Sequence, residues 1–274
     1  MKKSQQLHQS QQFVFFIYDN NRSNFSQVQL ERYPPREDVD YLFYQSIKTL
    51  RKHSAATIVV YITETVNTQP IEDIPNIEIQ YFKTEDWAGK RMFYRLQTAS
   101  KYPWKDGDQV IIADTDLLFN DDPFKIFNEN QNFDVFYTKR YDPKHFPINE
   151  GLSGYRWNKE KMSKYFNFWL KQATLFKAAT WKPYRNNLIK HGATSTDWQV
   201  GQIFLCTIHQ ERNKHNFPLK YMKFYDADCR WNYFLTIKKM KTAASKGKMK
   251  VFHMKGGPLK KRKNVDNILR LFRK

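Results

Sequence analysis

Three segments of the chain are apolar along almost their whole length rather than at every second residue. They are Phe13–Tyr18, Thr57–Thr63 and Gln109–Ala113, the last of which is apolar after its first residue. A strand with one face in water alternates between apolar and polar residues, whereas a strand covered on both faces is apolar throughout. These segments therefore predict an α/β protein whose mostly parallel central sheet is covered by helices.

The stretches between these segments have the spacing of helices. After Pro34-Pro35, apolar residues recur every three or four positions, at Val39, Leu42, Phe43, Ile47 and Leu50. We also expect helices over Arg91–Lys101, Met162–Leu175 and Asp197–Leu205, and strands over Ile77–Phe82, Phe133–Thr138 and Lys250–His253. Ligands bind such sheets beyond the carboxyl ends of the strands, so we look for chemistry there.

Length and cysteine content indicate the number of domains and the cellular compartment. The 274 residues, of which 41% are hydrophobic, suit one large domain with a packed core. Cys206 and Cys229 form no disulfide framework or zinc pattern, as expected of thiols in a reducing compartment. The run Phe13–Tyr18 is too short for a signal sequence or a membrane span. We therefore expect a cytoplasmic protein whose membrane contact, if it has one, is peripheral at the inner membrane surface.

The end of the chain is strongly basic. Fourteen Lys and Arg residues and one acid, Asp266, lie between Ile237 and Lys274, which supplies most of the net charge of +19. Such a block favours an anionic partner. We expect residues 1–262 to form the domain and residues 263–274 to form a basic amphipathic helix. That helix can bind a membrane surface, follow a phosphate backbone, or pack its apolar side on the domain.

One of four Asp-x-Asp triplets stands at a position suited to chemistry. The triplets begin at Asp38, Asp106, Asp114 and Asp226. Asp114 and Asp116 directly follow the apolar segment Val110–Ala113, so both side chains point the same way from the carboxyl end of a buried strand. Two carboxylates at the edge of an apolar core repel each other unless a cation neutralises them. A divalent ion with oxygen ligands would do so, the alternative being a loop with two solvated acids.

A metal held by two carboxylates keeps open positions that suit a diphosphate. The chain contains neither a Gly-x4-Gly-Lys-Ser/Thr run nor a Gly-x-Gly-x-x-Gly run after a strand. A P-loop nucleotidase and a classical dinucleotide enzyme are therefore disfavoured.

Several segments resemble one enzyme family when they are taken in order. Met92–Leu96 and Gln109–Phe119 are similar to the GT-A glycosyltransferases, most of all to glycosyltransferase family 8, which includes glycogenin and lipopolysaccharide galactosyltransferases. That family has a Tyr-x-Arg-Leu helix followed by a strand that ends in Asp-x-Asp. Asn149–Gly151 resembles the Asn-x-Gly acceptor-side loop of the family, Thr196–Gln199 its acidic helix start, and Val251–Gly256 its late His-x-x-Gly motif. The resemblance spans about residues 90 to 260 and implies a GT-A fold, Rossmann-like and in one domain.

The resemblance implies a metal site and a donor site. Mn²⁺ or Mg²⁺ would be held by Asp114, Asp116 and His253, with Asp114 also near the donor ribose. Arg95 and Asn149 would contact the nucleotide-sugar donor. Gly256 would let the backbone approach the diphosphate.

The phosphate contact and the catalytic region depart from the family pattern. Leu259 stands where the family has lysine, so Lys255 or Lys260 would contact the phosphates instead. The resemblance gives Asp197 and Gln199 the catalytic positions, with Asp197 touching the transferred sugar or acting as base, although an acid there can also cap a helix. Trp198 occupies the usual glutamine position, which leaves retention or inversion undecided.

The sequence therefore predicts a hexosyltransferase that moves a sugar from a nucleoside-diphosphate sugar to a hydroxyl, on a glycan or lipid-linked glycan at a membrane surface. Three alternatives stay open. The acceptor can be a modified base in DNA, as for some phage enzymes. The chain can be a nucleotidyltransferase with Asp121 or Asp122 as its third acid. Lastly, it can be a non-catalytic nucleic-acid-binding protein, with a basic groove, stacking aromatics and no metal.

Overall fold

The computed structural model describes residues 10–20, 33–83, 91–140, 147–175, 205, 208–233, 249–254 and 257–272. Within these residues, seven strands form one mixed sheet. The strands are β1 (Gln12–Tyr18), β2 (Thr57–Thr63), β3 (Ile77–Phe82), β4 (Gln109–Ala113), β6 (Val135–Lys139), β7 (Ile148–Arg156) and β8 (Phe224–Ala227). Their order in the sheet is β3-β2-β1-β4-β7-β6-β8. Strand β7 runs antiparallel to its neighbours β4 and β6, and the other pairs are parallel. The expected mostly parallel sheet is confirmed.

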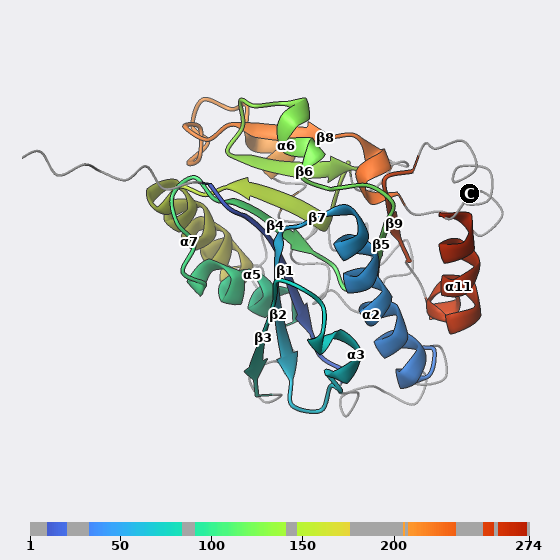
Figure 1. Ribbon diagram of the computed structural model, residues 1–274. Coiled ribbons are helices and arrows are strands. Elements are labelled where there is room, and N and C mark those ends of the chain that lie inside the picture. The colour runs from blue at the N-terminus through green and yellow to red at the C-terminus, as the bar shows by residue number, and fades with distance from the viewer. Residues whose placement is uncertain are drawn as a thin grey trace, which may run out of the picture.

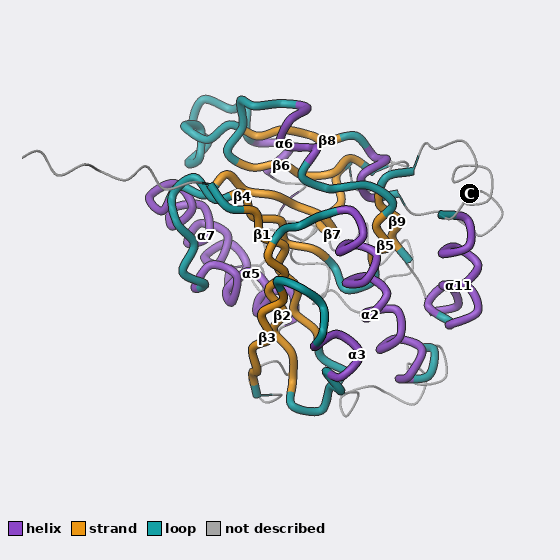
Figure 2. The backbone as a smooth tube through the Cα atoms, viewed as in Figure 1, coloured by secondary structure: helices purple, strands orange, loops and turns teal. Residues whose placement is uncertain are grey.

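Helices cover both faces of this sheet (Figures 1 and 2). Helices α2 (Arg36–His53), α3 (Gln69–Glu72) and α6 (Lys125–Glu129) contribute to the core on one face. Helices α5 (Arg91–Lys101) and α7 (Lys159–Leu175) contribute to the core on the other. Along β1, Phe13, Phe15 and Ile17 enter the second core, while the residues between them enter the first. Burial on both faces is the reason why the segment is apolar throughout.

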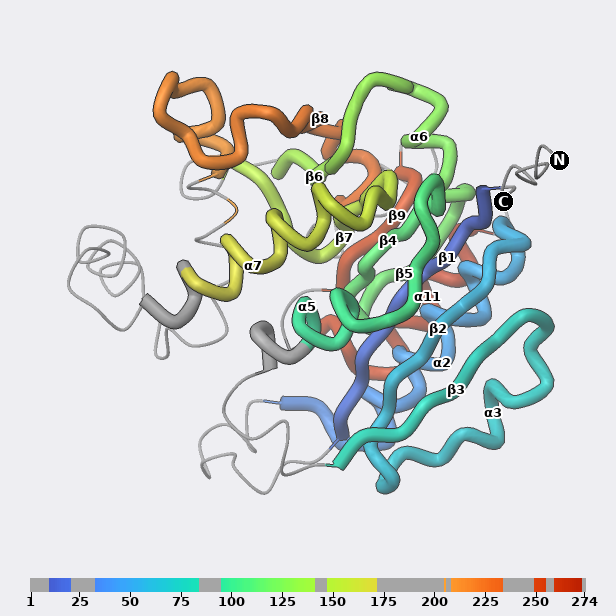
Figure 3. Tube along the Cα trace, turned by 90° about the vertical axis from the view of Figure 1, so that its left-hand side faces the viewer, coloured from blue at the N-terminus to red at the C-terminus, as the bar shows by residue number. Residues whose placement is uncertain are grey.

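A second, two-stranded sheet joins the middle of the chain to its end. Strand β5 (Leu117–Phe119) pairs antiparallel with β9 (Val251–His253), and Leu117 lies opposite His253. The pairing brings a residue near the end of the chain beside the segment that follows β4, and Figure 3 shows β4, β5 and β9 close together from the side.

Strand β7 was not predicted, and it corrects one expectation. Asn149–Gly151 was expected in a loop but lies within β7. The strand carries polar residues and two glycines, which weaken the sequence signal of a strand. Gly154 is required by packing, since a Cβ there would lie 2.0 Å from Cε1 of Phe136. The helix expected over Asp197–Leu205 lies outside the described residues except for Leu205.

Helix α11 (Arg262–Leu271) packs its apolar side on the domain. Val265 and Ile268 are buried in a cluster that includes Leu42 of α2 and Phe252 of β9. The hydroxyl of Tyr41 donates a hydrogen bond of 2.5 Å to Asp266. Of the three roles considered for this helix, packing of its apolar side on the domain is therefore observed. The domain boundary expected at residue 262 stays a prediction. Among the described helices, none combines the length and apolar character needed to cross a membrane.

Candidate active site

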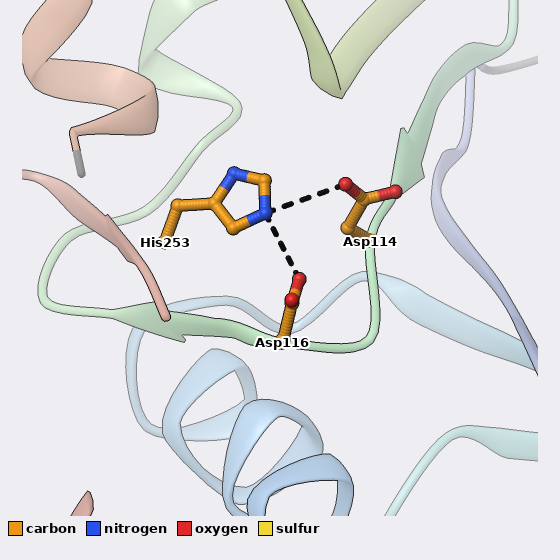
Figure 4. Close-up of side chains that lie close together, drawn as sticks. All are labelled: Asp114, Asp116 and His253. Carbon is orange, nitrogen blue, oxygen red and sulfur yellow. Dashed lines mark ion pairs between the residues drawn. The ribbon is translucent and has the colours of Figure 1, made fainter. Parts of the chain in front are cut away.

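Three side chains converge where β4 ends (Figure 4). Nε2 of His253 lies 3.0 Å from Oδ1 of Asp116 and 3.4 Å from Oδ2 of Asp114. Among the described residues they are the one group of three or more His, Cys, Asp or Glu side chains placed to share a metal ion, with ligand atoms within 4.8 Å of one another. The structure thus brings together the three residues predicted as metal ligands.

Backbone hydrogen bonds hold this segment in place. The N–H of Asp114 donates to the carbonyl of Gly151 in β7 at 2.8 Å. The N–H of Met254, just after β9, donates to the carbonyl of Asp116 at 2.9 Å. The turn between β4 and β5 is therefore tied to the large sheet on one side and to β9 on the other.

Each of the two acids has one oxygen on a cation and the other turned toward His253. Oδ1 of Asp114 accepts a hydrogen bond from the guanidinium of Arg95. Oδ2 of Asp116 lies 2.6 Å from Nζ of Lys260, which belongs to the 3-10 helix η4 (Gly257–Lys260). Three ligand atoms, two carboxylate oxygens and one imidazole nitrogen, are left facing one point. Hard oxygen ligands with one imidazole fit Mn²⁺ or Mg²⁺.

Arg95 is buried and anchors Asp114 rather than reaching outward. Its guanidinium also donates to the carbonyl of Glu150 at 3.1 Å and lies 3.7 Å from the Glu150 carboxylate. Burial lowers the pKa of Arg95, but the carboxylates of Asp114 and Glu150 outweigh it and raise that pKa. Arg95 therefore stays cationic, and its predicted contact with the donor stays a prediction.

Asp116 and Lys260 form a charged pair inside the site. Burial alone raises the pKa of Asp116, but Lys260 and His253 outweigh it and hold that pKa well below its usual range. Burial lowers the pKa of Lys260, and Asp116 more than reverses this effect. Asp116 is thus an ionised ligand at neutral pH, and the predicted phosphate-binding lysine lies at the metal site.

Gly151 is needed for the close approach of β7 to the site. A Cβ at this position would lie 2.5 Å from Cε1 of His253 and 2.9 Å from Oδ2 of Asp114. No side chain fits such a gap without displacing those ligands. Asn149 is also buried, and its Oδ1 accepts the N–H of Gly151 at 3.0 Å, so in this structure it shapes the strand beside the site.

The remaining predicted residues are placed elsewhere or not described. Asp197, Gln199, Lys255 and Gly256 lie outside the described residues. Asp121, the third acid considered for a nucleotidyltransferase, is paired with Lys125 at 2.6 Å and Lys250 at 2.5 Å. It is not a member of the cluster formed by the described residues, so the nucleotidyltransferase alternative loses its support from Asp121.

Sequence reasoning missed the residues that support the ligands from behind. Asn232, Thr138 and Glu150 are buried and polar. Asn232 contacts the ligand His253 and Thr138, and Glu150 contacts Arg95, which binds the ligand Asp114. Asn232 ends the 3-10 helix η3 (Cys229–Asn232). Its place beside Trp231 carries no signal in the sequence, because its role depends on a tertiary contact.

Comparison with known proteins shows the fold. No family model matches the chain, and no curated protein matches it in sequence. The crystal structure of the galactosyltransferase LgtC, in complex with donor and acceptor sugar analogues, superposes with a TM-score of 0.53 at 14% identity, covering 95% of each chain. The glycosyltransferase GlyE of Streptococcus pneumoniae TIGR4 gives a TM-score of 0.50 at 11% identity, covering 89% of this chain and 55% of that one. The chain therefore has the GT-A fold that the resemblance to family 8 predicted.

Proposed function

We propose that the chain is a metal-dependent glycosyltransferase that moves a hexose from a nucleoside-diphosphate sugar to a hydroxyl. The observation that carries the proposal is the convergence of Asp114, Asp116 and His253 at the carboxyl end of β4. In a GT-A fold this is where a donor is expected. The solved structure of LgtC, which has this fold, holds donor and acceptor sugar analogues.

The three residues would hold Mn²⁺ or Mg²⁺ through two carboxylate oxygens and Nε2 of His253. When bound, the ion supplies a Lewis acid for the diphosphate leaving group. Arg95 keeps one oxygen of Asp114 occupied, so that the other stays turned to the site. Asp114 is thereby oriented before any donor arrives.

Lys260 would bind a phosphate oxygen of the donor. Its side chain is 19% exposed and its ammonium group lies beside Asp116, so it can add a positive charge next to the ion. Lys255 and Gly256 are proposed to lie along the same diphosphate, and Arg95 and Asn149 to border the donor. Asp197 and Gln199 are proposed to contact the transferred sugar and the acceptor hydroxyl.

The acceptor is proposed to be a glycan on an anionic membrane surface, reached from the cytoplasm. Around α11 the basic side chains of Lys261, Lys263 and Arg270 are exposed, while the apolar stripe of the helix packs on the domain. Contact with a surface would therefore be electrostatic and weakened by salt. Replacing these three residues with glutamine should abolish binding to anionic vesicles. Vesicle binding that survives would contradict the proposal, and DNA binding with a steep salt dependence would favour the nucleic-acid acceptor.

Thermal denaturation with a panel of nucleoside-diphosphate sugars, with and without Mn²⁺, tests the proposed reaction. A ligand that binds the native state at about 100 times its dissociation constant adds about 2.7 kcal/mol to the free energy of unfolding. We expect at least one donor to stabilise the protein only when Mn²⁺ is present, and Asp116→Asn to lose that effect. Stabilisation by a donor in excess chelator, or by none of the donors with Mn²⁺, would contradict the metal-dependent mechanism.

A further inference from the structure

A buried chain of hydrogen bonds connects His253 to the large sheet. Nδ1 of His253 lies 2.8 Å from Oδ1 of Asn232. Nδ2 of Asn232 donates to the hydroxyl of Thr138 at 2.8 Å. All three residues are at most 1% exposed, so their polar groups need hydrogen-bond partners within the protein.

The direction of each hydrogen bond follows from the hydroxyl of Thr138. That hydroxyl has one proton, and its acceptors are the carbonyls of Asn149 at 3.1 Å and Leu152 at 3.3 Å, both in β7. It must therefore accept from the amide nitrogen of Asn232. This orients the amide so that its oxygen faces His253, and Nδ1 of His253 carries a proton and donates it.

The pairing of β6 with β7 shifts register between Tyr137 and Thr138. Bulges of this kind bend a strand and redirect a side chain, and they occur often beside functional sites. Here the shift lies immediately before the residue whose hydroxyl reaches two carbonyls of the partner strand. The sheet itself thus sets the start of the hydrogen-bond chain.

The consequence appears at the other ring nitrogen. Because Nδ1 donates to Asn232, Nε2 is the ring nitrogen that faces Oδ1 of Asp116 and Oδ2 of Asp114. When a metal ion displaces the proton of Nε2, the lone pair of Nε2 and the two carboxylate oxygens form a set of three donors for that ion. Metal-bound histidines commonly donate their second N–H to such a partner, which fixes the tautomer and the ring orientation.

We propose that Asn232 is a positioning residue that holds His253 in the metal-binding tautomer and orientation, and that Thr138 orients Asn232. This inference rests on the proposed metal site, and it assigns to that site two residues on η3 and β6.

The test is the Mn²⁺ affinity of the full chain, measured by electron paramagnetic resonance. Asn232→Ala should weaken Mn²⁺ binding about 10- to 100-fold, the usual effect of losing an outer partner of a metal-bound histidine. Asn232→Asp should restore binding to within a few-fold of wild type, since a carboxylate also accepts the Nδ1 proton. Rescue by this conservative change separates positioning from a general loss of structure.

Tyr137→Phe is the matched control. Tyr137 precedes Thr138 on β6 and is equally buried, but its hydroxyl pairs with Tyr165 at 2.6 Å in the core on the other face. Its loss removes a buried hydrogen bond and should leave Mn²⁺ affinity unchanged. Thr138→Val is a second route to the same test, because it frees the Asn232 amide to turn, and it should weaken Mn²⁺ binding several-fold.

Wild-type affinity in Asn232→Ala would overturn the inference, as would Asn232→Asp binding no better than Asn232→Ala. If Asn232→Ala does not fold, unchanged affinity in Thr138→Val overturns it instead. Failure of the wild-type chain to bind Mn²⁺ is a different result, which contradicts the proposed function itself.

Discussion

Two Asp-x-Asp triplets of the same spacing lie at the ends of two strands of one sheet, yet their surroundings differ. Asp114 and Asp116 follow β4, whereas Asp226 lies in β8 and Asp228 follows it. Both oxygens of Asp226 accept hydrogen bonds from the guanidinium of Arg212, each at 2.8 Å. Asp226 thus has both oxygens on one cation, whereas each acid of the first triplet has one oxygen on a cation and turns the other toward a common point.

Asp228 is also paired with an arginine. It accepts from the backbone and the side chain of Arg230 at 2.8 and 2.9 Å and thereby caps η3. A triplet whose acids are all paired with arginine is structural. His209 lies 3.4 Å from Oδ2 of Asp226, but it does not form a metal-ligand group with the second triplet. Among the described residues only the first triplet, to which β9 brings His253, forms a candidate metal site.

The largest effect should come from removing one charge of the first triplet. Asp116→Asn keeps the size of the side chain but loses an ionised ligand, so Mn²⁺ affinity and sugar transfer should fall by more than about 100-fold, beyond the loss for outer partners. Isothermal titration with Mn²⁺ and a donor-turnover assay measure the two losses. Near-normal turnover in this variant would place the metal elsewhere.

His253→Ala should have the next largest effect. The ion would keep two carboxylate ligands and lose its nitrogen ligand, so Mn²⁺ affinity should drop about 100-fold, the upper end of the loss for outer partners, while turnover at saturating Mn²⁺ recovers in part. A titration of donor turnover against Mn²⁺ concentration shows the shift. Unchanged Mn²⁺ dependence would leave His253 with a role in packing alone.

Gly151→Ala should disturb the first triplet through geometry alone. The added methyl group meets the His253 ring at 2.5 Å, so the ring or the strand must move. We expect about 10-fold weaker Mn²⁺ binding, the lower end of the loss from disturbing a ligand's support, and a loss of about 1–3 kcal/mol in the free energy of unfolding.

Gly154→Ala on the same strand is the control for that variant. Its methyl group meets Phe136 at 2.0 Å and not the ligands, so it should cost stability without weakening Mn²⁺ binding. Equal losses of Mn²⁺ affinity in the two variants would show that β7 acts only through general stability.

The sheet was predictable where burial leaves a mark on the sequence. Strands β2 and β4 have the predicted bounds because runs of apolar residues record burial in the sheet. Strand β3 also has the predicted bounds, but it was recognised from its alternating pattern and is only partly buried. Strand β7 was missed because its polar residues, among them Asn149 and Ser153, are buried through hydrogen bonds, which hydropathy does not reveal.

Of the site, the three proposed metal ligands were predictable from the sequence. The position of Asp114 and Asp116 followed from the end of an apolar strand, and His253 from the resemblance to a family. Asn232, the partner of His253, and Glu150, the partner of Arg95, are set by contacts between distant segments, which no local pattern encodes. The difference between the two triplets has the same origin, since both read Asp-x-Asp and only tertiary contacts distinguish them.

The smallest effect on the metal is expected from the second triplet, where the loss should appear in stability instead. Asp226→Asn removes the charge that pairs with Arg212, and we expect unchanged Mn²⁺ affinity with a loss of about 2 kcal/mol in the free energy of unfolding, the scale of a hydrogen bond to a charged group. Burial raises the pKa of Asp226, but His209 and Arg212 outweigh it and hold that pKa well below its usual range.

A carboxylate with a lowered folded-state pKa stabilises the protein above its unfolded-state pKa of about 3.9 and loses that contribution as the pH falls toward the folded-state value. The stability difference between wild type and Asp226→Asn should therefore be full at neutral pH and shrink once the pH falls below about 4. Urea denaturation of both proteins across this range measures it. A difference that stays constant to low pH would mean that the charge of Asp226 contributes nothing, and a loss of Mn²⁺ affinity would mean that the two triplets are not independent.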